Sequence, residues 1–169
     1  MPGETRSDAA LGGLLRVSAC LGLRDHSLLV PVLEEARHLS DPREIEEVLM
    51  QNHLFVGYPV AMNALAAWRE LEPTPSVSDT LEAAGVTAGG TTVGELEARG
   101  EQLCRQVYGS TYEGLRTNVA ALHPALDQWM CSVGYGWVLS RPQLDAVTRE
   151  LCVVALLAVL DVPPQLYSH

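Results

Sequence analysis

The stretch RPQLDAVTRELCVVALLAVL, Arg141–Leu160, decides the fold class of this chain. Ser140 or Arg141 stands directly before Pro142, and a proline in this place is typical of the first turn of a helix. The apolar run from Leu151 to Leu160 is too short to cross a bilayer. We therefore predict a helix of a globular protein that begins near Pro142 and is stopped by Pro163-Pro164.

The rest of the chain also has the periodicity of helices. Apolar residues recur every three or four positions, and β-branched runs bounded by Asn-Gly or Asp-Gly turns are missing. Ser40 or Asp41 can cap a helix that begins at Pro42, and the segment 57–59, Gly-Tyr-Pro, ends it. A helix over residues 27–39 contains Pro31, which is tolerated only near a first turn. Residues 125–140 are mixed in period. These patterns predict an all-α fold.

One segment has the composition of a linker. Residues 73–94 contain two prolines, a Gly-Gly pair and many small polar residues, which cannot bury much apolar area. The segment separates two helical halves, residues 1–72 and 95–169. We expect the halves to form one domain, because a chain of 169 residues that is 47% hydrophobic can bury one core of ordinary size.

The charge of the chain bears on its partners and location. Lys and Arg number 11 against 21 Asp and Glu, so the formal net charge is −10. A phosphate backbone would be repelled by such a protein, which argues against nucleic acid. The first residues carry no signal-peptide pattern, and no membrane span is predicted. We expect a cytoplasmic protein.

The cysteines and histidines do not predict a metal site. Cys20, Cys104, Cys131 and Cys152 are far apart, with no CxxC pair and no Cys/His cluster at metal-ligand spacing. Free cysteines usually pack as small buried hydrophobic residues, and we expect these four to do so. We expect neither a metal nor an organic cofactor.

Four stretches resemble the superfamily of carboxymuconolactone decarboxylases and alkylhydroperoxidase D proteins. They are RGEQLCRQVYG (99–109), YGWVLSRPQLDAVTRELCVVALLAVL (135–160), PPQLYSH (163–169) and PREIEEVLMQNHLFVGYPVAMNAL (42–65). The resemblance covers most of the chain outside the linker. It implies an alkylhydroperoxidase D-like helical bundle that forms a homo-oligomer, a trimer or hexamer in typical relatives.

The order of these stretches departs from the family. In a typical member the segment that resembles residues 100–169 comes first, and the segment that resembles residues 27–70 follows the histidine. The resemblance therefore implies a circular permutation, which is plausible where chain ends are close on the surface. A swap of the halves between subunits is the alternative. Residues 19–30 can also be aligned with residues 158–169, which places Val30 opposite His169. Extended toward the N-terminus in the same register, the alignment places Leu11 opposite Glu150.

The resemblance also implies which residues carry the chemistry. The peroxidase branch has two cysteines and a histidine after a glutamate. Counted from Glu150, the two cysteine positions hold Val162 and Gln165, and the histidine position holds His169. Both sulfurs are therefore absent. A peroxide-reducing dithiol needs a thiolate and a resolving thiol. The decarboxylase branch needs no cysteine, and there His169 acts as hydrogen-bond donor or acid while Glu150 orients it or shuttles the proton.

Other residues are candidates for binding a carboxylate substrate. Arg141 and Arg149 are the nearest cations, although they can equally be solvated or pair with Asp145 and Glu150. His53 and Tyr58 are expected at the pocket, although a structural role is common for such residues.

The function expected from the resemblance is a cofactor-independent lyase like 4-carboxymuconolactone decarboxylase. It would act on a small lactone carboxylic acid in the breakdown of aromatic compounds. One alternative is a non-catalytic oligomeric binding protein of the same fold, and the other is an alkylhydroperoxidase-type peroxidase.

Overall fold

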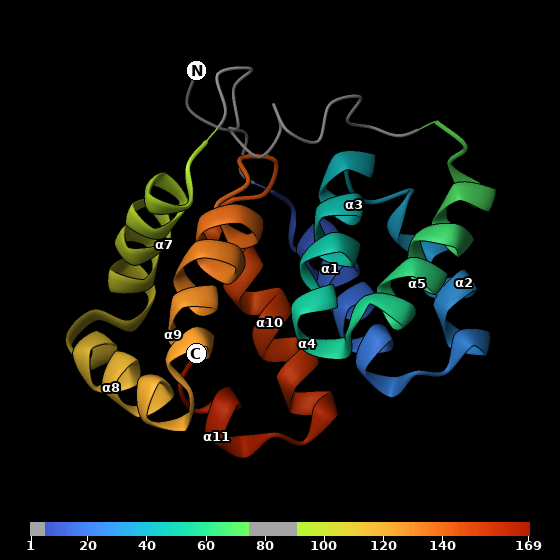
Figure 1. Cartoon of the computed structure of the whole chain (residues 1–169). Helices are drawn as coiled ribbons and strands as arrows, with labels where there is room; N and C mark the ends of the chain where they lie inside the picture. Colours follow the sequence, from blue (N-terminus) through green and yellow to red (C-terminus); the bar gives the residue numbers. More distant parts are fainter. Residues whose placement is uncertain (1–5, 75–90) are drawn as a thin grey trace. The chain divides into compact units, whose positions relative to one another are not determined.

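The computed structural model describes residues 6–74 and 91–169, and all regular elements within these ranges are helical. The predicted all-α class is thereby confirmed. Figure 1 shows the helices along the chain. They are α1 (Asp8–Leu23), α2 (His26–Ala36), α3 (Pro42–Gln51), α4 (His53–Val56), α5 (Tyr58–Leu71), α7 (Val93–Tyr108), η1 (Gly109–Thr111), α8 (Tyr112–Leu122), α9 (Pro124–Trp129), the π-helix η2 (Met130–Leu139), α10 (Ala146–Leu160) and α11 (Pro163–Leu166).

The chain divides into two compact units. Unit 1 comprises residues 1–78 and 143–167, and unit 2 comprises residues 79–142 and 168–169. Helix α10, from the second half of the sequence, thus belongs with the helices of the first half. Residues 75–90 of the expected linker lie outside the described residues, and a single domain stays a prediction. No described helix is both long and apolar enough to span a membrane.

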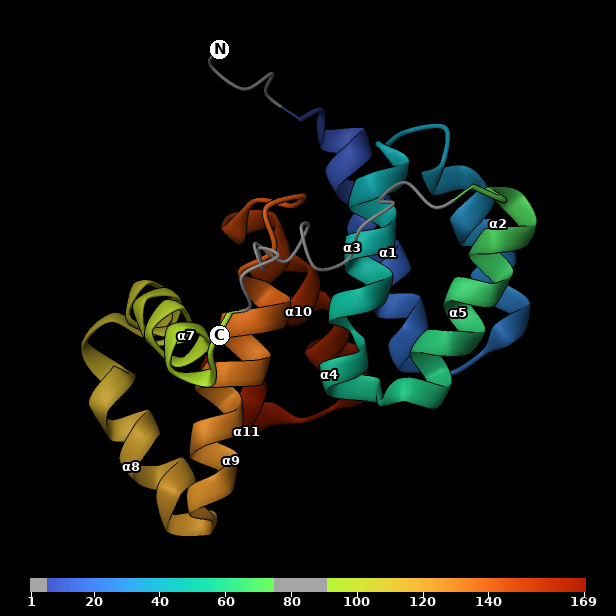
Figure 2. The ribbon, with the colours of Figure 1, turned by 45° about the horizontal axis from the view of Figure 1, so that its top comes forward.

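Unit 1 has a core formed by α1, α2, α3, α5 and α10. Its fully buried apolar side chains include Leu14, Leu33, Val48, Trp68 and Leu156. Figure 2 shows α2 and α5 side by side, where they contact each other. Full burial of one large apolar side chain contributes roughly 1.5–3 kcal/mol, so this core is the main stabilising feature of unit 1.

Helices α1 and α10 are neighbours with the same form. The Ser18 hydroxyl donates to the carbonyl oxygen of Cys152 at 2.6 Å, and one turn later Gly22 lies against Leu156, so the helices run in the same direction. Each ends in a left-handed residue, Arg24 (φ 56°) or Asp161 (φ 53°), before a second helix begins. The alignment of residues 19–30 with residues 158–169 therefore has a structural counterpart in these two helix ends. The alignment placed Arg24 opposite Pro163, whereas the two helix ends pair Arg24 with Asp161. The register of the alignment is therefore wrong by two residues.

Unit 2 is centred on the contact between α7 and η2. A Cβ atom at Gly100 would lie 1.8 Å from the carbonyl oxygen of Cys131. A Cβ atom at Gly136 would lie 2.1 Å from the carbonyl oxygen of Leu96. The two backbones therefore touch at these glycines, because no side chain separates them.

The predicted boundaries of the first helices are mostly confirmed. Asp41 caps α3 by accepting a hydrogen bond from the amide of Arg43 at 2.8 Å, and Pro42 opens that helix. The chain breaks at Gly57, whose φ of 83° suits glycine, but the helix expected from Pro42 to this break is interrupted at Asn52, between α3 and α4. Pro31 lies inside α2 rather than in its first turn.

The expected start of α10 at Pro142 is wrong. The helix begins at Ala146, because the Asp145 carboxylate accepts a hydrogen bond from the Thr148 amide at 2.9 Å and so forms the cap. Burial opposes ionisation of Asp145, but the bond from this amide and the Arg6 guanidinium lower its pKa to about 2. Pro163 opens α11 instead of only ending α10, which stops at Asp161.

Candidate functional site

The residues expected to form the site are distributed over both units. His169 and Arg141 belong to unit 2, whereas Glu150, Arg149, His53 and Tyr58 belong to unit 1. Glu150 is half-buried on α10, Arg141 is buried, and Tyr58 is 68% exposed at the start of α5. The geometry that follows is therefore that of each unit by itself.

In unit 2, His169 is part of a cluster with two tyrosines. The hydroxyl of Tyr108 lies 3.2 Å from Nε2 of His169 and 2.8 Å from the hydroxyl of Tyr135. The ring centroids are 5.5 Å apart for Tyr108 and His169, and 5.9 Å apart for the two tyrosines. Tyr135 is buried, while Tyr108 and His169 are half-buried. The imidazole is thus held by a hydroxyl that is itself held by a second hydroxyl.

The close contact of α7 and η2 positions the two tyrosines. Tyr108 is the last residue of α7, and Tyr135 precedes Gly136 on η2. Cys131, Tyr135 and Leu139, at intervals of four residues along η2, are all buried. The segment of mixed period, residues 125–140, thus includes a π-helix.

In unit 1, Arg149 is buried in an ion pair with Glu47. Its Nη2 lies 2.8 Å from Oε2 of Glu47, and the side chains are 2% and 1% exposed. Its Nη1 donates to the Gln51 side chain at 3.0 Å, and its Nε donates to the carbonyl oxygen of Leu144 at 3.2 Å. The guanidinium is therefore buried rather than solvated, and it already neutralises the carboxylate of Glu47.

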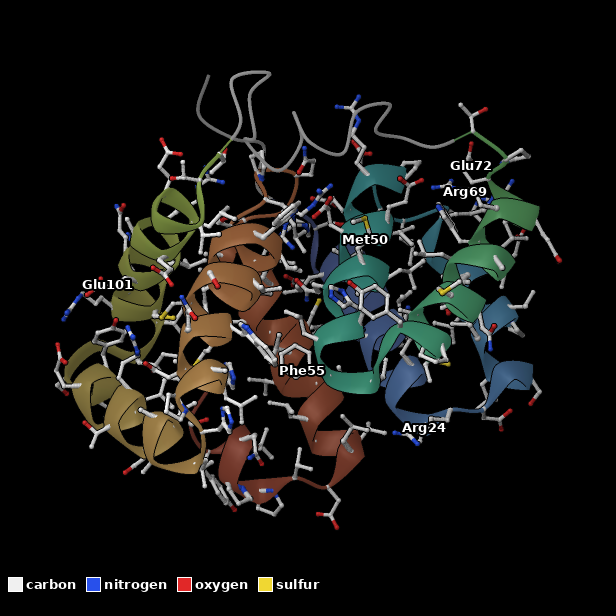
Figure 3. All side chains as sticks on the ribbon, in the orientation of Figure 1. Arg24, Met50, Phe55, Arg69, Glu72 and Glu101 are labelled. Atoms are coloured by element: carbon white, nitrogen blue, oxygen red, sulfur yellow. The ribbon has the colours of Figure 1, made fainter. Side chains whose placement is uncertain are left out.

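His53 and Tyr58 lie together at the turn between α4 and α5. Nδ1 of His53 is 2.5 Å from the carbonyl oxygen of Met50, and its ring centroid is 4.7 Å from that of Tyr58. Figure 3 labels Met50 on α3. A carbonyl oxygen accepts only from a nitrogen that carries a hydrogen, so this contact places a hydrogen on Nδ1 of His53.

Unit 1 also contains an open cavity between α1, α2 and α5. Its volume is about 450 Å³, within the range of small-molecule sites. Apolar side chains, including Leu21, Leu29 and Ala64, form part of the lining. Arg24, which Figure 3 shows at the turn after α1, and Glu70 supply charged groups. Sequence patterns gave no indication of this cavity, because its residues come from three separate segments.

The cysteines lack the properties of a peroxidatic pair. All four are free and buried. Burial raises the pKa of Cys20 and Cys131, and raises the pKa of Cys152 to about 12. A thiol with a raised pKa holds little thiolate near neutral pH, and the thiolate is the nucleophile.

We expect the thiols of the folded protein to be unreactive. At pH 7.5, Ellman's reagent should label fewer than about one thiol per chain within minutes, and all four after unfolding in guanidinium chloride. Peroxide added before unfolding should not reduce that final number. Rapid labelling of one thiol in the folded protein, or its loss to peroxide, would support the peroxidase alternative.

Two residues of the cluster were missed by sequence reasoning. Tyr108 and Tyr135 appeared only within the stretches quoted for the resemblance, because a hydrogen-bond partner far away in sequence leaves no local pattern. Among residues 6–74 and 91–169, no group of three or more His, Cys, Asp or Glu side chains could hold a metal ion. Comparisons of the chain with models of protein families, with curated proteins and with solved structures give no match.

Proposed function

We propose that this chain is a cofactor-independent lyase that decarboxylates a small lactone carboxylic acid, as a permuted member of the carboxymuconolactone decarboxylase superfamily. The observation that carries the proposal is the hydrogen bond between His169 and Tyr108. It holds in place the imidazole at the position where the resemblance expects an acid. A histidine with a fixed ring can deliver a proton to one defined point of a substrate.

The reaction makes two demands that this cluster can meet. Cleavage of the bond between the ring carbon and the carboxylate releases CO₂ and leaves the electron pair in the unsaturated lactone as a dienolate. Donors near the lactone oxygen stabilise that charge, and an acid must then protonate carbon. We assign the acid to His169, and solvent restores its proton after each turnover.

The proposal includes a homo-oligomer, for which α10 offers support. This helix has few polar residues, and a helix that is apolar on all sides is normally covered. Val147 and Leu151 are nevertheless 71% and 39% exposed. Their counterparts on α1, Ala10 and Leu14, are 6% and 0% exposed. A second copy of the chain is the partner we propose for this apolar stripe.

Loss of γ-carboxymuconolactone, followed by its ultraviolet absorbance, tests the proposed activity. We expect turnover by the intact protein and a loss of about 100-fold or more in kcat in His169→Gln, since general acids contribute at least that much. His38→Gln, at a side chain that is 67% exposed, is the matched control and should retain activity. Glu150→Gln tests the second residue implied by the resemblance.

Binding without turnover is the second candidate function, and the cavity of about 450 Å³ favours it. Calorimetric titration with the same lactone distinguishes the two. Heat of binding without loss of absorbance, abolished when Ala64→Leu fills the cavity, would support a binding protein. If the lactone is neither bound nor consumed, it is excluded as the ligand of both candidate functions.

A further inference from the structure

The hydroxyl of Tyr108 has two partners of different chemistry. Nε2 of His169 lies 3.2 Å from it, and the hydroxyl of Tyr135 lies 2.8 Å from it. A hydroxyl has one hydrogen to donate and can accept as well. The direction of each bond therefore decides which nitrogen of His169 carries the hydrogen.

The chemistry of the partners sets that direction. A neutral imidazole nitrogen is a better acceptor than a phenol oxygen, and a phenol is a more acidic donor than an imidazole N–H. The favoured arrangement has Tyr108 donating to Nε2 of His169, with Tyr135 donating to Tyr108. The hydrogen of the neutral ring then lies on Nδ1, the opposite of the preference of histidine in water.

We propose that Tyr108 is a positioning residue that fixes His169 as the tautomer with hydrogen on Nδ1, and that Tyr135 orients the Tyr108 hydroxyl. The catalytic meaning of this inference rests on the proposed function: with Nε2 held by Tyr108, Nδ1 is the nitrogen that we assign to the substrate. The tautomer itself is a property of the free protein.

The chain of hydroxyls also suits the protonated ring. In the imidazolium, Nε2–H donates to the Tyr108 oxygen, and Tyr108 then donates to the Tyr135 oxygen. Both directions keep the same two hydrogen bonds, so the ring need not turn when its charge changes. In the lyase reaction the imidazolium is the acid: its Nδ1–H bond breaks as a C–H bond forms at the dienolate carbon, which leaves a neutral ring with its hydrogen on Nε2. A proton taken up from solvent at Nδ1 then restores the imidazolium.

Long-range proton–nitrogen NMR spectra of the full chain labelled with ¹⁵N test the proposal. At about pH 9 an ordinary imidazole is neutral, and the spectra distinguish the two tautomers. His169→Gln identifies the signals of His169 among the five histidines. We expect the wild-type ring to carry its hydrogen on Nδ1.

Substitution of the tyrosines gives the comparison. Tyr108→Phe should change the tautomer ratio of His169 by about tenfold toward Nε2–H, the effect of losing one hydrogen bond. Tyr135→Phe should cause a smaller change in the same direction. Tyr167→Phe, at a residue that is 87% exposed, is the matched control and should cause none.

The outcomes separate this inference from the proposed activity. A wild-type ring with hydrogen on Nε2, or a ratio unchanged in a folded Tyr108→Phe variant, would overturn it. If that variant does not fold, the wild-type tautomer and Tyr135→Phe decide the question. A ring with hydrogen on Nδ1 in a protein that does not consume lactone would preserve the positioning role and refute the proposed substrate.

Discussion

Gly100→Ala is expected to destabilise the protein by about 3 kcal/mol or more, at the upper end of overpacking effects. The added Cβ would lie 1.8 Å from the carbonyl oxygen of Cys131, a backbone atom that cannot rotate away. Gly136→Ala should act similarly, because its Cβ would lie 2.1 Å from the carbonyl oxygen of Leu96. Denaturation in urea, followed by circular dichroism, measures the change.

Gly114→Ala is the matched control for these substitutions. Gly114 lies in α8, and a Cβ there would meet no atom within 4 Å. Alanine favours helix over glycine, so this variant should be more stable by about 0.5–1 kcal/mol. If Gly100→Ala were as stable as Gly114→Ala, α7 and η2 would not be in backbone contact, and the placement of Tyr108 beside Tyr135 would lose its basis.

Arg149→Met is expected to cost about 3–5 kcal/mol, because it leaves a buried carboxylate without its cation. Glu47 is 1% exposed on its side chain, so water cannot replace the guanidinium. The double variant Glu47→Leu with Arg149→Met should recover most of that stability, since no charge then remains buried. Urea denaturation of the single and double variants gives the coupling energy.

Arg105→Met provides the exposed counterpart. Arg105 pairs with Glu101 at 2.8 Å, but both side chains are about half exposed, at 51% and 45%. Exposed ion pairs contribute little net stability, so this variant should destabilise the protein much less than Arg149→Met does. Equal effects of Arg105→Met and Arg149→Met would contradict the burial of the Glu47 pair.

Local features of the fold were readable from the sequence. Asp41 before Pro42, and Gly57 before the Tyr-Pro of α5, act through backbone groups within a few residues, so their patterns are short. The start of α10 was misplaced for a related reason. Asp145 competes with Ser140 as a cap, and its hydrogen bonds to Thr148 and its ion pair with Arg6 decide the outcome. Of these contacts, only the ion pair with Arg6 involves a residue that is distant in the sequence.

The polar contacts of the candidate site were not readable in this way. Glu47 is 102 positions from Arg149, so no local pattern in the sequence indicated this partner. Tyr108 is 27 positions from Tyr135 and 61 from His169. The resemblance indicated His169, but only the packing of α7 on the π-helix shows which hydroxyls meet its ring.

The fate of the substrate carboxylate tests most directly whether this protein is a lyase with His169 as its acid. The lactone would carry ¹³C in that group, and the reaction would run in D₂O under NMR observation. We expect one labelled CO₂ and one deuterium on carbon for each product molecule, at a rate reduced about 100-fold or more in His169→Gln. Label that stays on the lactone, or an equal rate in the variant, would contradict the proposed function.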